Sequence, residues 1–294
     1  GKLYLLDHEN DRLILLNDKG FRKWEQTFDN NLTNVYNFNR KHIYITTKKE
    51  TEEEFTLFKL DTSDGSKLWS HDLGEKNIRD IIVNNENQVY ISTHNSEIIK
   101  LDNQQDVLWN ISIDDGPQFM STRLDGNDNL YALTKSDNLY CFDSKGKKLW
   151  EKNVNSISET EEYGTKIEVY NDHIYLFTNR SLYRLGNEGN TKNKFRTEDG
   201  EISSLSFKKD DKFYILKRKQ NFSSIKAVDG EGVEKWKHDL ILNDSKTNIM
   251  IGLSQNDRIY CQFFNFTTSV KVYKILCFER DGTLAWKQVY NEGN

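Results

Sequence analysis

One sequence pattern recurs along the whole chain, and it constrains the fold more than any other feature. Seven runs place Tyr after an aliphatic or aromatic residue, as in LYLL at Tyr4 and LYAL at Tyr131, and they lie 39 to 46 residues apart. Each run is followed by a polar turn and then an aromatic residue, as in DSKGKKLW, which ends at Trp150. A fixed period of this length is the signature of a repeat architecture. The copies fill residues 1–294, so we expect a single domain.

Each repeat contains four segments with the character of β-strands. In the fourth repeat they are QFMSTRL, NLYALT, NLYCFD and KKLWEKNV, rich in aromatic and β-branched residues and separated by Gly, Asn, Asp and Ser. The two middle segments are apolar on both faces, which indicates a sheet that is covered on both sides. Four-stranded sheets repeated every ~40 to 45 residues predict a β-propeller. A solenoid, the alternative, has shorter repeats and capping units.

We therefore predict an all-β fold, a seven-bladed β-propeller of four-stranded antiparallel blades. Only three residues precede Tyr4, so blade 1 is expected to lack its innermost strand, which gives 27 blade strands in all. An unpaired inner edge leaves backbone groups unsatisfied, so we expect a flanking segment of a longer chain to complete blade 1. The predicted blades span residues 1–28, 29–73, 74–113, 114–155, 156–198, 199–240 and 241–294.

The turn before each aromatic anchor carries a more specific motif. The pattern of apolar residue, Asp, polar turn, Gly, three residues and Trp, as in KLDTSDGSKLW and CFDSKGKKLW, resembles the tryptophan-docking repeat of quinoprotein-like (PQQ-like) propellers, in their non-enzymatic BamB-like branch. The resemblance implies that Gly146 permits the turn and that each aromatic anchor docks on the next blade. The predicted docking residues are Trp24, Trp69, Trp109, Trp150, Phe195, Trp236 and Trp286. Phe195 replaces Trp after a two-residue insertion, and we expect its contact to be looser.

Motifs for catalysis or metal binding are missing from the sequence. It contains no HExxH, GxSxG or GxxxxGK[ST], and its three Cys lie in apolar runs typical of buried thiols, with a disulfide between two of them as the alternative. Residues 125–129 are interpreted as a hairpin turn, with an adventitious cation site as the alternative. The quinone-dependent dehydrogenases of the same group have a disulfide between adjacent cysteines, which this chain lacks. We predict no cofactor, no metal and no enzymatic activity.

Charge and hydropathy exclude two further classes of protein. The net charge is −5, and the 41 basic residues are scattered along the chain, whereas a nucleic-acid-binding protein needs a concentrated basic stripe. No apolar run is long enough to span a membrane as a helix.

The hairpin between the strand Tyr and the docking aromatic varies in length among the blades. The separation is 25 and 26 residues in blades 2 and 7 and 22 in blade 6, against 19 or 20 elsewhere. We expect these hairpins to project from one face and to bind a partner, with solvated hairpin tips as the alternative. Residues 263–266 are expected to expose aromatic surface beside hairpin 47–55. The predicted partner-binding residues are Phe263, Phe264, Phe266, Lys49, Glu52 and Glu53.

The sequence thus favours a non-catalytic propeller that binds a protein or a cell-surface polymer through loops on one face. We expect an extracytoplasmic location, at the cell surface, in the periplasm or secreted. One alternative is a quinone-dependent dehydrogenase-like enzyme with a site in the central channel. Another is a purely architectural or sensor domain of a larger surface protein.

Overall fold

The computed structural model describes residues 3–17, 21–37, 41–113, 118–158, 162–170, 173–196, 201–208, 212–219, 222–229, 233–241, 248–253, 258–264 and 271–292. The chain forms two compact units, Gly1–Leu149 and Trp150–Asn294. The division falls inside strand β15 (Lys148–Asn153).

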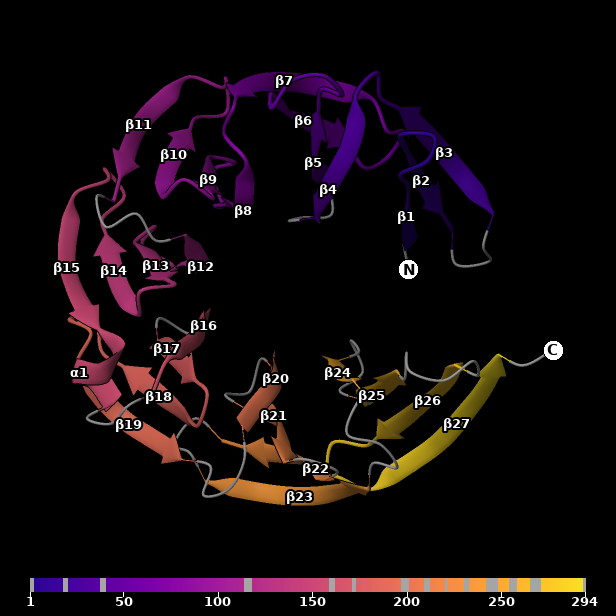
Figure 1. Ribbon diagram of the computed structural model, residues 1–294, viewed down its shortest axis with the longest axis vertical. Coiled ribbons are helices and arrows are strands. Elements are labelled where there is room, and N and C mark those ends of the chain that lie inside the picture. Colours follow the sequence, from indigo (N-terminus) through magenta and orange to yellow (C-terminus); the bar gives the residue numbers. More distant parts are fainter. Residues whose placement is uncertain are drawn as a thin grey trace. The chain divides into compact units, whose positions relative to one another are not determined.

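Unit 1 contains blades 1 to 3 and most of blade 4, which follow one another in chain order (Figure 1). Every sheet is an antiparallel meander in which consecutive strands are neighbours. The strands of blades 1 and 2 are β1 (Leu3–Asp7), β2 (Arg12–Leu16), β3 (Arg22–Thr27), β4 (Asn31–Asn37), β5 (His42–Lys48), β6 (Phe55–Asp61) and β7 (Lys67–Gly74). Those of blades 3 and 4 are β8 (Ile78–Val83), β9 (Val89–Thr93), β10 (Glu97–Leu101), β11 (Val107–Ser112), β12 (Phe119–Leu124), β13 (Leu130–Thr134), β14 (Asn138–Phe142) and β15.

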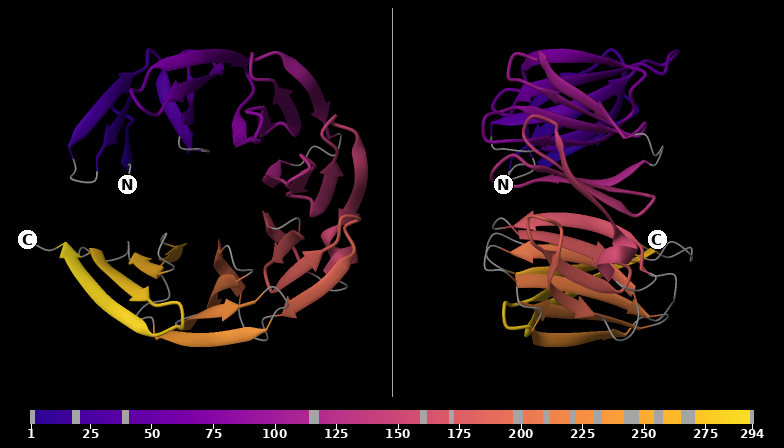
Figure 2. Two further views of the ribbon diagram at one scale, coloured as in Figure 1. Left: turned by 180° about the vertical axis from the view of Figure 1, so that it is seen from behind. Right: turned by 90° about the vertical axis from the view of Figure 1, so that its left-hand side faces the viewer.

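Unit 2 contains blades 5 to 7, again in chain order (Figure 2). A short helix, α1 (Val154–Ser158), precedes blade 5 and buries Val154 and Ile157. The strands of blades 5 and 6 are β16 (Gly164–Tyr170), β17 (His173–Thr178), β18 (Ser181–Leu185), β19 (Thr191–Arg196), β20 (Glu201–Lys208), β21 (Lys212–Lys219), β22 (Phe222–Val228) and β23 (Glu234–Ile241). Those of blade 7 are β24 (Asn248–Leu253), β25 (Ile259–Phe264), β26 (Lys271–Phe278) and β27 (Leu284–Glu292).

These sheets confirm the predicted fold class. The described residues form 27 strands, four in each of six sheets and three in blade 1, where β1 pairs with β2 alone. All five residues of β9 and of β13 are buried, as expected for strands that are covered on both faces. The helix α1 is the one departure from an all-β chain within the described ranges. The completion of blade 1 by a flanking segment and the single domain over 1–294 stay predictions.

The strand Tyr and the Trp of one blade lie in a row across three strands. In blade 2, Tyr44 pairs with Lys59 and Lys59 pairs with Trp69, just after a one-residue bulge. The bulge shifts the register so that the two aromatic rings meet across the sheet. Their centroids lie 5.8 to 6.0 Å apart in Tyr4–Trp24, Tyr44–Trp69, Tyr90–Trp109, Tyr214–Trp236 and Tyr260–Trp286.

The Trp side chain also reaches the turn of the next blade. Trp109 Nε1 donates to Ser144 O at 3.1 Å, and a Cβ added to Gly146 would lie 3.0 Å from Trp109 Cδ2. Gly146 has a φ of 82°, so glycine serves both the turn and the close approach of the ring. The same contact joins Trp24 to Gly65, Trp150 to Gly189 and Trp236 to Gly282. How much these contacts stabilise the fold stays a prediction.

Candidate functional site

Blade 5 departs from the common row. Tyr175 pairs with Arg184 and Arg184 pairs with Asn193, so Asn193 occupies the position of the docking Trp. Phe195 pairs instead with Leu182, two residues further along β19. The predicted assignment of Phe195 to the docking position is therefore wrong, because the turn of blade 5 contains no insertion.

Phe195 nevertheless packs on blade 6. It is half-buried against a core cluster that includes Phe213 and Val228. A small cavity of about 10 Å³ remains where Phe195, Phe213 and Asn193 meet. A cavity next to an aromatic side chain forfeits dispersion contacts, but the looser contact that we expected at Phe195 stays a prediction.

The turn of blade 5 has lost an acidic residue as well. In blade 4, Asp143 opens the turn, and its Oδ1 accepts from Lys145 N and Lys147 N, both at 2.9 Å. Gly186 occupies the equivalent place in blade 5, because Gly186 N donates to Asn190 O as Asp143 N donates to Lys147 O. Blade 5 thus lacks both the carboxylate and the indole of the repeat.

Two flexible side chains lie close to Gly186. An added Cβ would lie 2.6 Å from Asn190 Oδ1 and 2.6 Å from Lys192 Cε. These two side chains therefore lie over the glycine, in the space that a side chain at position 186 would take. The equivalent residue is an acid in blade 4, at Asp143, and an asparagine in blade 1, at Asn17.

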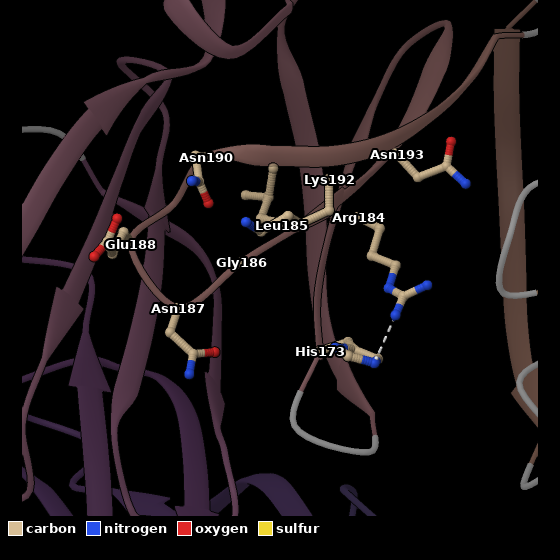
Figure 3. Close-up of a pocket in the computed structure, with 9 residues that line it drawn as sticks. All are labelled: His173, Arg184, Leu185, Gly186, Asn187, Glu188, Asn190, Lys192 and Asn193. Atoms are coloured by element: carbon tan, nitrogen blue, oxygen red, sulfur yellow. Dashed lines mark hydrogen bonds between the residues drawn. The ribbon is translucent and has the colours of Figure 1, made fainter.

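These replacements border a hollow of about 670 Å³ on blade 5 (Figure 3). Its volume is within the range of small-molecule sites, ~300 to 1,000 Å³. The polar lining consists of His173, Arg184, Asn187, Asn190, Lys192 and Asn193. Glu188 also lines the hollow, and it lies at the end of the turn away from Arg184 in Figure 3.

Arg184 and His173 orient each other inside this hollow. Arg184 Nη2 donates to His173 Nε2 at 2.8 Å. Because a guanidinium has only donors, Nε2 of His173 is the acceptor of this bond. His173 lies at the start of β17 and packs edge-on against Tyr175 with centroids 6.4 Å apart.

Cations occupy the middle of the row in other blades too, but aromatic rings or turn groups of the next blade cover them. The Lys59 ammonium lies 5.8 Å from the Tyr44 ring centroid and 6.0 Å from that of Trp69. The Lys100 ammonium lies 4.7 Å from the Tyr90 centroid and donates to Ser144 O at 3.1 Å. Burial lowers the pKa of both lysines. In blade 5, Arg184 pairs with Asn193, which stands where the other blades have the Trp.

The hairpin that was predicted to bind a partner is built around its own charges. Lys48 pairs with Glu53 at 2.6 Å, and Lys49 pairs with Glu52 at 3.0 Å and with Glu54. The hydrogen bonds that the Lys49 ammonium donates to Glu54 and Glu52 raise the pKa of Lys49. The two lysines thus pair with three of the four glutamates of residues 48–54, and the tip keeps a net negative charge. The partner-binding role of Lys49, Glu52 and Glu53 stays a prediction.

The expected aromatic surface on blade 7 is wrong at Phe263. That side chain is only 4% exposed and belongs to the core cluster of blades 6 and 7. It faces the same side of β25 as Cys261, and the Lys274 ammonium lies 4.8 Å from its ring centroid. Phe264 closes β25 by pairing with Asn248, but its side chain lies outside the described residues, as does Phe266.

Two smaller predictions concern the cysteines and the turn at 125–129. Cys141, Cys261 and Cys277 are free and buried, which confirms the interpretation as buried thiols. Burial raises the pKa of Cys141 and Cys261 to about 12.

In the segment 125–129, Asp125 Oδ1 accepts from Asn127 N and Asn129 N, so this segment is a hairpin turn, as predicted. The described residues hold no cluster of three His, Cys, Asp or Glu that could ligate a metal.

A group of titratable residues on the inner strands of unit 1 escaped the sequence-based search. Asp80 Oδ2 on β8 lies 3.5 Å from both Thr122 Oγ1 and Arg123 Nη1. Burial raises the pKa of Asp80. Burial and, secondarily, the Asp80 charge raise the pKa of Tyr36 to about 12. Tyr36, Asp80 and the pair Thr122–Arg123 come from three different repeats, and for that reason no local motif indicates the group.

The fold and its repeats define a β-propeller of PQQ-like repeats, and comparisons with known proteins agree. A family profile described as outer membrane protein assembly factor BamB matches residues 1–164, more than half of the chain. The chain therefore belongs to this PQQ-like family. No curated protein matches the sequence. Among the described residues, no helix is long and apolar enough to cross a membrane.

Two solved structures show the fold at low sequence identity. BamB from Moraxella catarrhalis matches with a TM-score of 0.59 and 14% identity, covering 99% of this chain and 98% of that one. A streptogramin B lyase structure matches with a TM-score of 0.61 and 12% identity, covering 90% of this chain and 83% of that one. At such identities the likeness concerns architecture and carries no residue roles.

Proposed function

We propose that this chain is a non-catalytic scaffold of the cell envelope that binds a protein partner through its extended hairpins. The observation that carries the proposal is the uneven length of the middle strands. They have seven residues each in β5 and β6 and eight and seven in β21 and β22, but five each in β9, β10, β13 and β14. The additional residues exceed what the packing of the repeat requires.

The hairpin of blade 2 is the best-defined of these projections. Its backbone closes through Lys49 N donating to Glu54 O at 3.0 Å, and its ion pairs hold the tip in one conformation. A preorganised tip loses less conformational entropy on binding than a mobile one. The family to which the chain belongs is named for outer-membrane protein assembly, which supports a protein as partner and an extracytoplasmic location.

The test replaces residues 49–54 with the short turn of blade 3, residues 94–96, and captures proteins from an envelope extract by cross-linking. We expect the wild-type chain to cross-link to a discrete partner and the shortened chain to lose it. The matched control exchanges residues 94–96 for 135–137 of blade 4, which changes a turn without changing hairpin length. Equal capture by all three chains would contradict the proposal.

An enzyme with a site on the inner strands is the second candidate, and Asp80 is the residue that favours it. A half-buried carboxylic acid with a raised pKa beside Tyr36 and Arg123 could exchange a proton with a ligand. The likeness to a streptogramin B lyase is compatible with this reading at the level of fold. Turnover that is present in the wild type and lost in Asp80→Asn would favour the enzyme over the scaffold.

A further inference from the structure

We propose that the hairpin between β17 and β18 of blade 5 forms a carboxylate-binding site. Glu162 occupies this site as an intramolecular ligand, and the acidic side chain of a partner segment competes with it. The residues that form the site are Glu162, Thr178, Ser181 and Tyr183, each of them at most 3% exposed. The site does not depend on the proposed partner-binding hairpins, and it lies at the end of blade 5 opposite to the hollow.

Three hydroxyl groups donate to the carboxylate of Glu162. Thr178 Oγ1 donates to Oε2 at 2.5 Å, Ser181 Oγ donates to Oε1 at 3.0 Å, and Tyr183 OH donates to Oε2 at 3.3 Å. A buried charge is costly unless hydrogen bonds replace its hydration, and bonds to a charged acceptor are the stronger kind. Both carboxylate oxygens are bonded here, whereas an amide or an alcohol would offer these donors one oxygen. The three donors therefore favour a carboxylate.

The hairpin positions its donors through its own turn. Thr178 Oγ1 accepts from Ser181 N at 2.8 Å, so the backbone fixes the place of this oxygen. When the carboxylate leaves, the Thr178 hydroxyl can donate to Ser181 O, which lies 3.2 Å away. Thr134 of blade 4 has this second arrangement, because its Oγ1 accepts from Asn138 N and donates to Asn138 O, both at 3.2 Å. The site is thus preformed for a carboxylate and tolerates its departure.

Glu162 lies outside the sheet whose hairpin it binds. It belongs to the connection between β15 and β16, residues 154–163, whereas the connection between β7 and β8 consists of residues 75–77. The strand pairing of blade 5 does not involve Glu162. Its carboxylate therefore reaches the donors as a ligand does, and an external acidic side chain can present the same group.

A cation beside the site favours an acidic ligand further. The Lys194 ammonium lies 4.9 Å from the Tyr183 ring centroid and donates to Ser158 O at 3.2 Å. Positive charge at this place attracts a carboxylate and leaves a neutral ligand of the same shape unaffected.

The experiment is chemical rescue with acetate, followed by NMR of the intact chain labelled with nitrogen-15. Glu162→Ala removes the equivalent of one acetate and leaves the three hydroxyls in place. We expect acetate to shift the backbone amide signals of residues 178–183 saturably in this variant, and acetamide, which is neutral and of similar size, to cause no saturable shift. In wild type Glu162 competes, so the apparent Kd for acetate should be at least about tenfold higher. Titrations extend to about 1 M acetate at constant ionic strength.

Further variants make the test specific to this hairpin. Ser181→Ala, added to Glu162→Ala, should weaken acetate binding about tenfold, since it removes one donor to a charged group. Glu188→Ala, which removes an exposed acid of the same blade, should respond to acetate as wild type does.

Several outcomes would overturn the proposal. The absence of a saturable shift in Glu162→Ala, or undiminished binding after Ser181→Ala, would exclude the site. An equal apparent Kd in wild type and Glu162→Ala, or a wild type that does not respond at about 1 M acetate, would exclude competition. If Glu162→Ala does not fold, Glu162→Gln replaces it, and hydrogen exchange at Ser181 N should then be about tenfold faster than in wild type. Unchanged exchange would count against the site in the same way.

Discussion

A Cβ at Gly65, in the turn between β6 and β7 of blade 2, would lie 2.7 Å from Cε3 of Trp24. Trp24 belongs to the preceding blade, and its side chain packs on this turn. Such a distance is incompatible with any side chain unless the indole moves. Trp24 Nε1 also donates to Thr62 O at 3.3 Å, so the ring is held against the turn from two sides. At Gly65, Gly146, Gly189 and Gly282 the glycine of the turn therefore leaves room for the Trp of the blade before it.

Gly65→Ala should destabilise the protein by more than its backbone conformation alone explains. Gly65 has φ 80°, which costs a residue with a Cβ about 1–2 kcal/mol, and the clash with Trp24 should add about 1–3 kcal/mol. Gly74→Ala is the matched control, because Gly74 has φ 57° and no atom within 4 Å of an added Cβ. Urea unfolding measures both. In a Trp24→Ala background the difference between the two variants should disappear, and its persistence would refute the contact.

The Trp residues should differ in their contribution to stability. Trp24 is 8% exposed, so Trp24→Ala should cost about 3–5 kcal/mol. Trp150 is half-buried, and Trp150→Ala should cost less, about 1–3 kcal/mol, since less apolar area returns to water. Leu149→Ala, next to it and 49% exposed, should change stability by less than about 0.5 kcal/mol. If both Trp variants unfold at the same temperature as the wild type, the prediction that these side chains stabilise the fold by docking is wrong.

Trp69→Phe should be tolerated better than Trp109→Phe. Trp109 Nε1 donates to Ser144 O, whereas the buried Trp69 Nε1 has no hydrogen-bond partner among the described residues. The receiving turn of blade 3 has Gln105, with φ 77°, where other turns have glycine. Losing the bond of Trp109 should cost about 0.5–1.5 kcal/mol more than the matching change at Trp69. An equal cost, measured by denaturant unfolding, would contradict this assignment.

Asp80→Asn should stabilise the folded state near neutral pH. Because burial raises the folded pKa of Asp80, this residue favours folding fully below its unfolded pKa, about 3.9, and that contribution is lost as pH rises through the folded value. The Tm difference between variant and wild type should therefore grow from near zero at about pH 3 to a positive value at about pH 7. Asp106→Asn, at an exposed site, is the control and should show no such trend. A difference that is independent of pH would contradict the burial of Asp80.

The repeat made the fold predictable because Tyr, turn and Trp recur at nearly constant spacing and each has a packing reason. The docking position of blade 5 could have been found by spacing as well. Gly189 and Asn193 are four residues apart, as are Gly146 and Trp150, but an aromatic residue at 195 diverted the assignment. Chemical similarity favours Phe195, but the register of a bulged strand fixes which side chains meet.

The hollow and the buried Phe263 show what sequence reasoning missed. Alternation along β25 puts Phe263 on the same side as Cys261, so extending the strand by two residues would have predicted its burial. The hollow arises from two replacements, at Gly186 and Asn193, that lie on different sides of one turn. Neither replacement belongs to a sequence motif. The two become informative only in the structure, where both line the same hollow as Arg184.

The reach of each Trp onto the following blade also sets the order in which the protein can be completed during synthesis. The indole and the carbonyl that receives it are separated by 35 residues at Trp109 and by 44 at Trp236. A ribosome that adds about 5–20 residues per second needs roughly 2–9 s to make the receiving turn. During that interval the indole of the newest blade is uncovered. The turn of the next blade covers it once that turn has been made. Each docking contact can therefore form only after the following blade has been made.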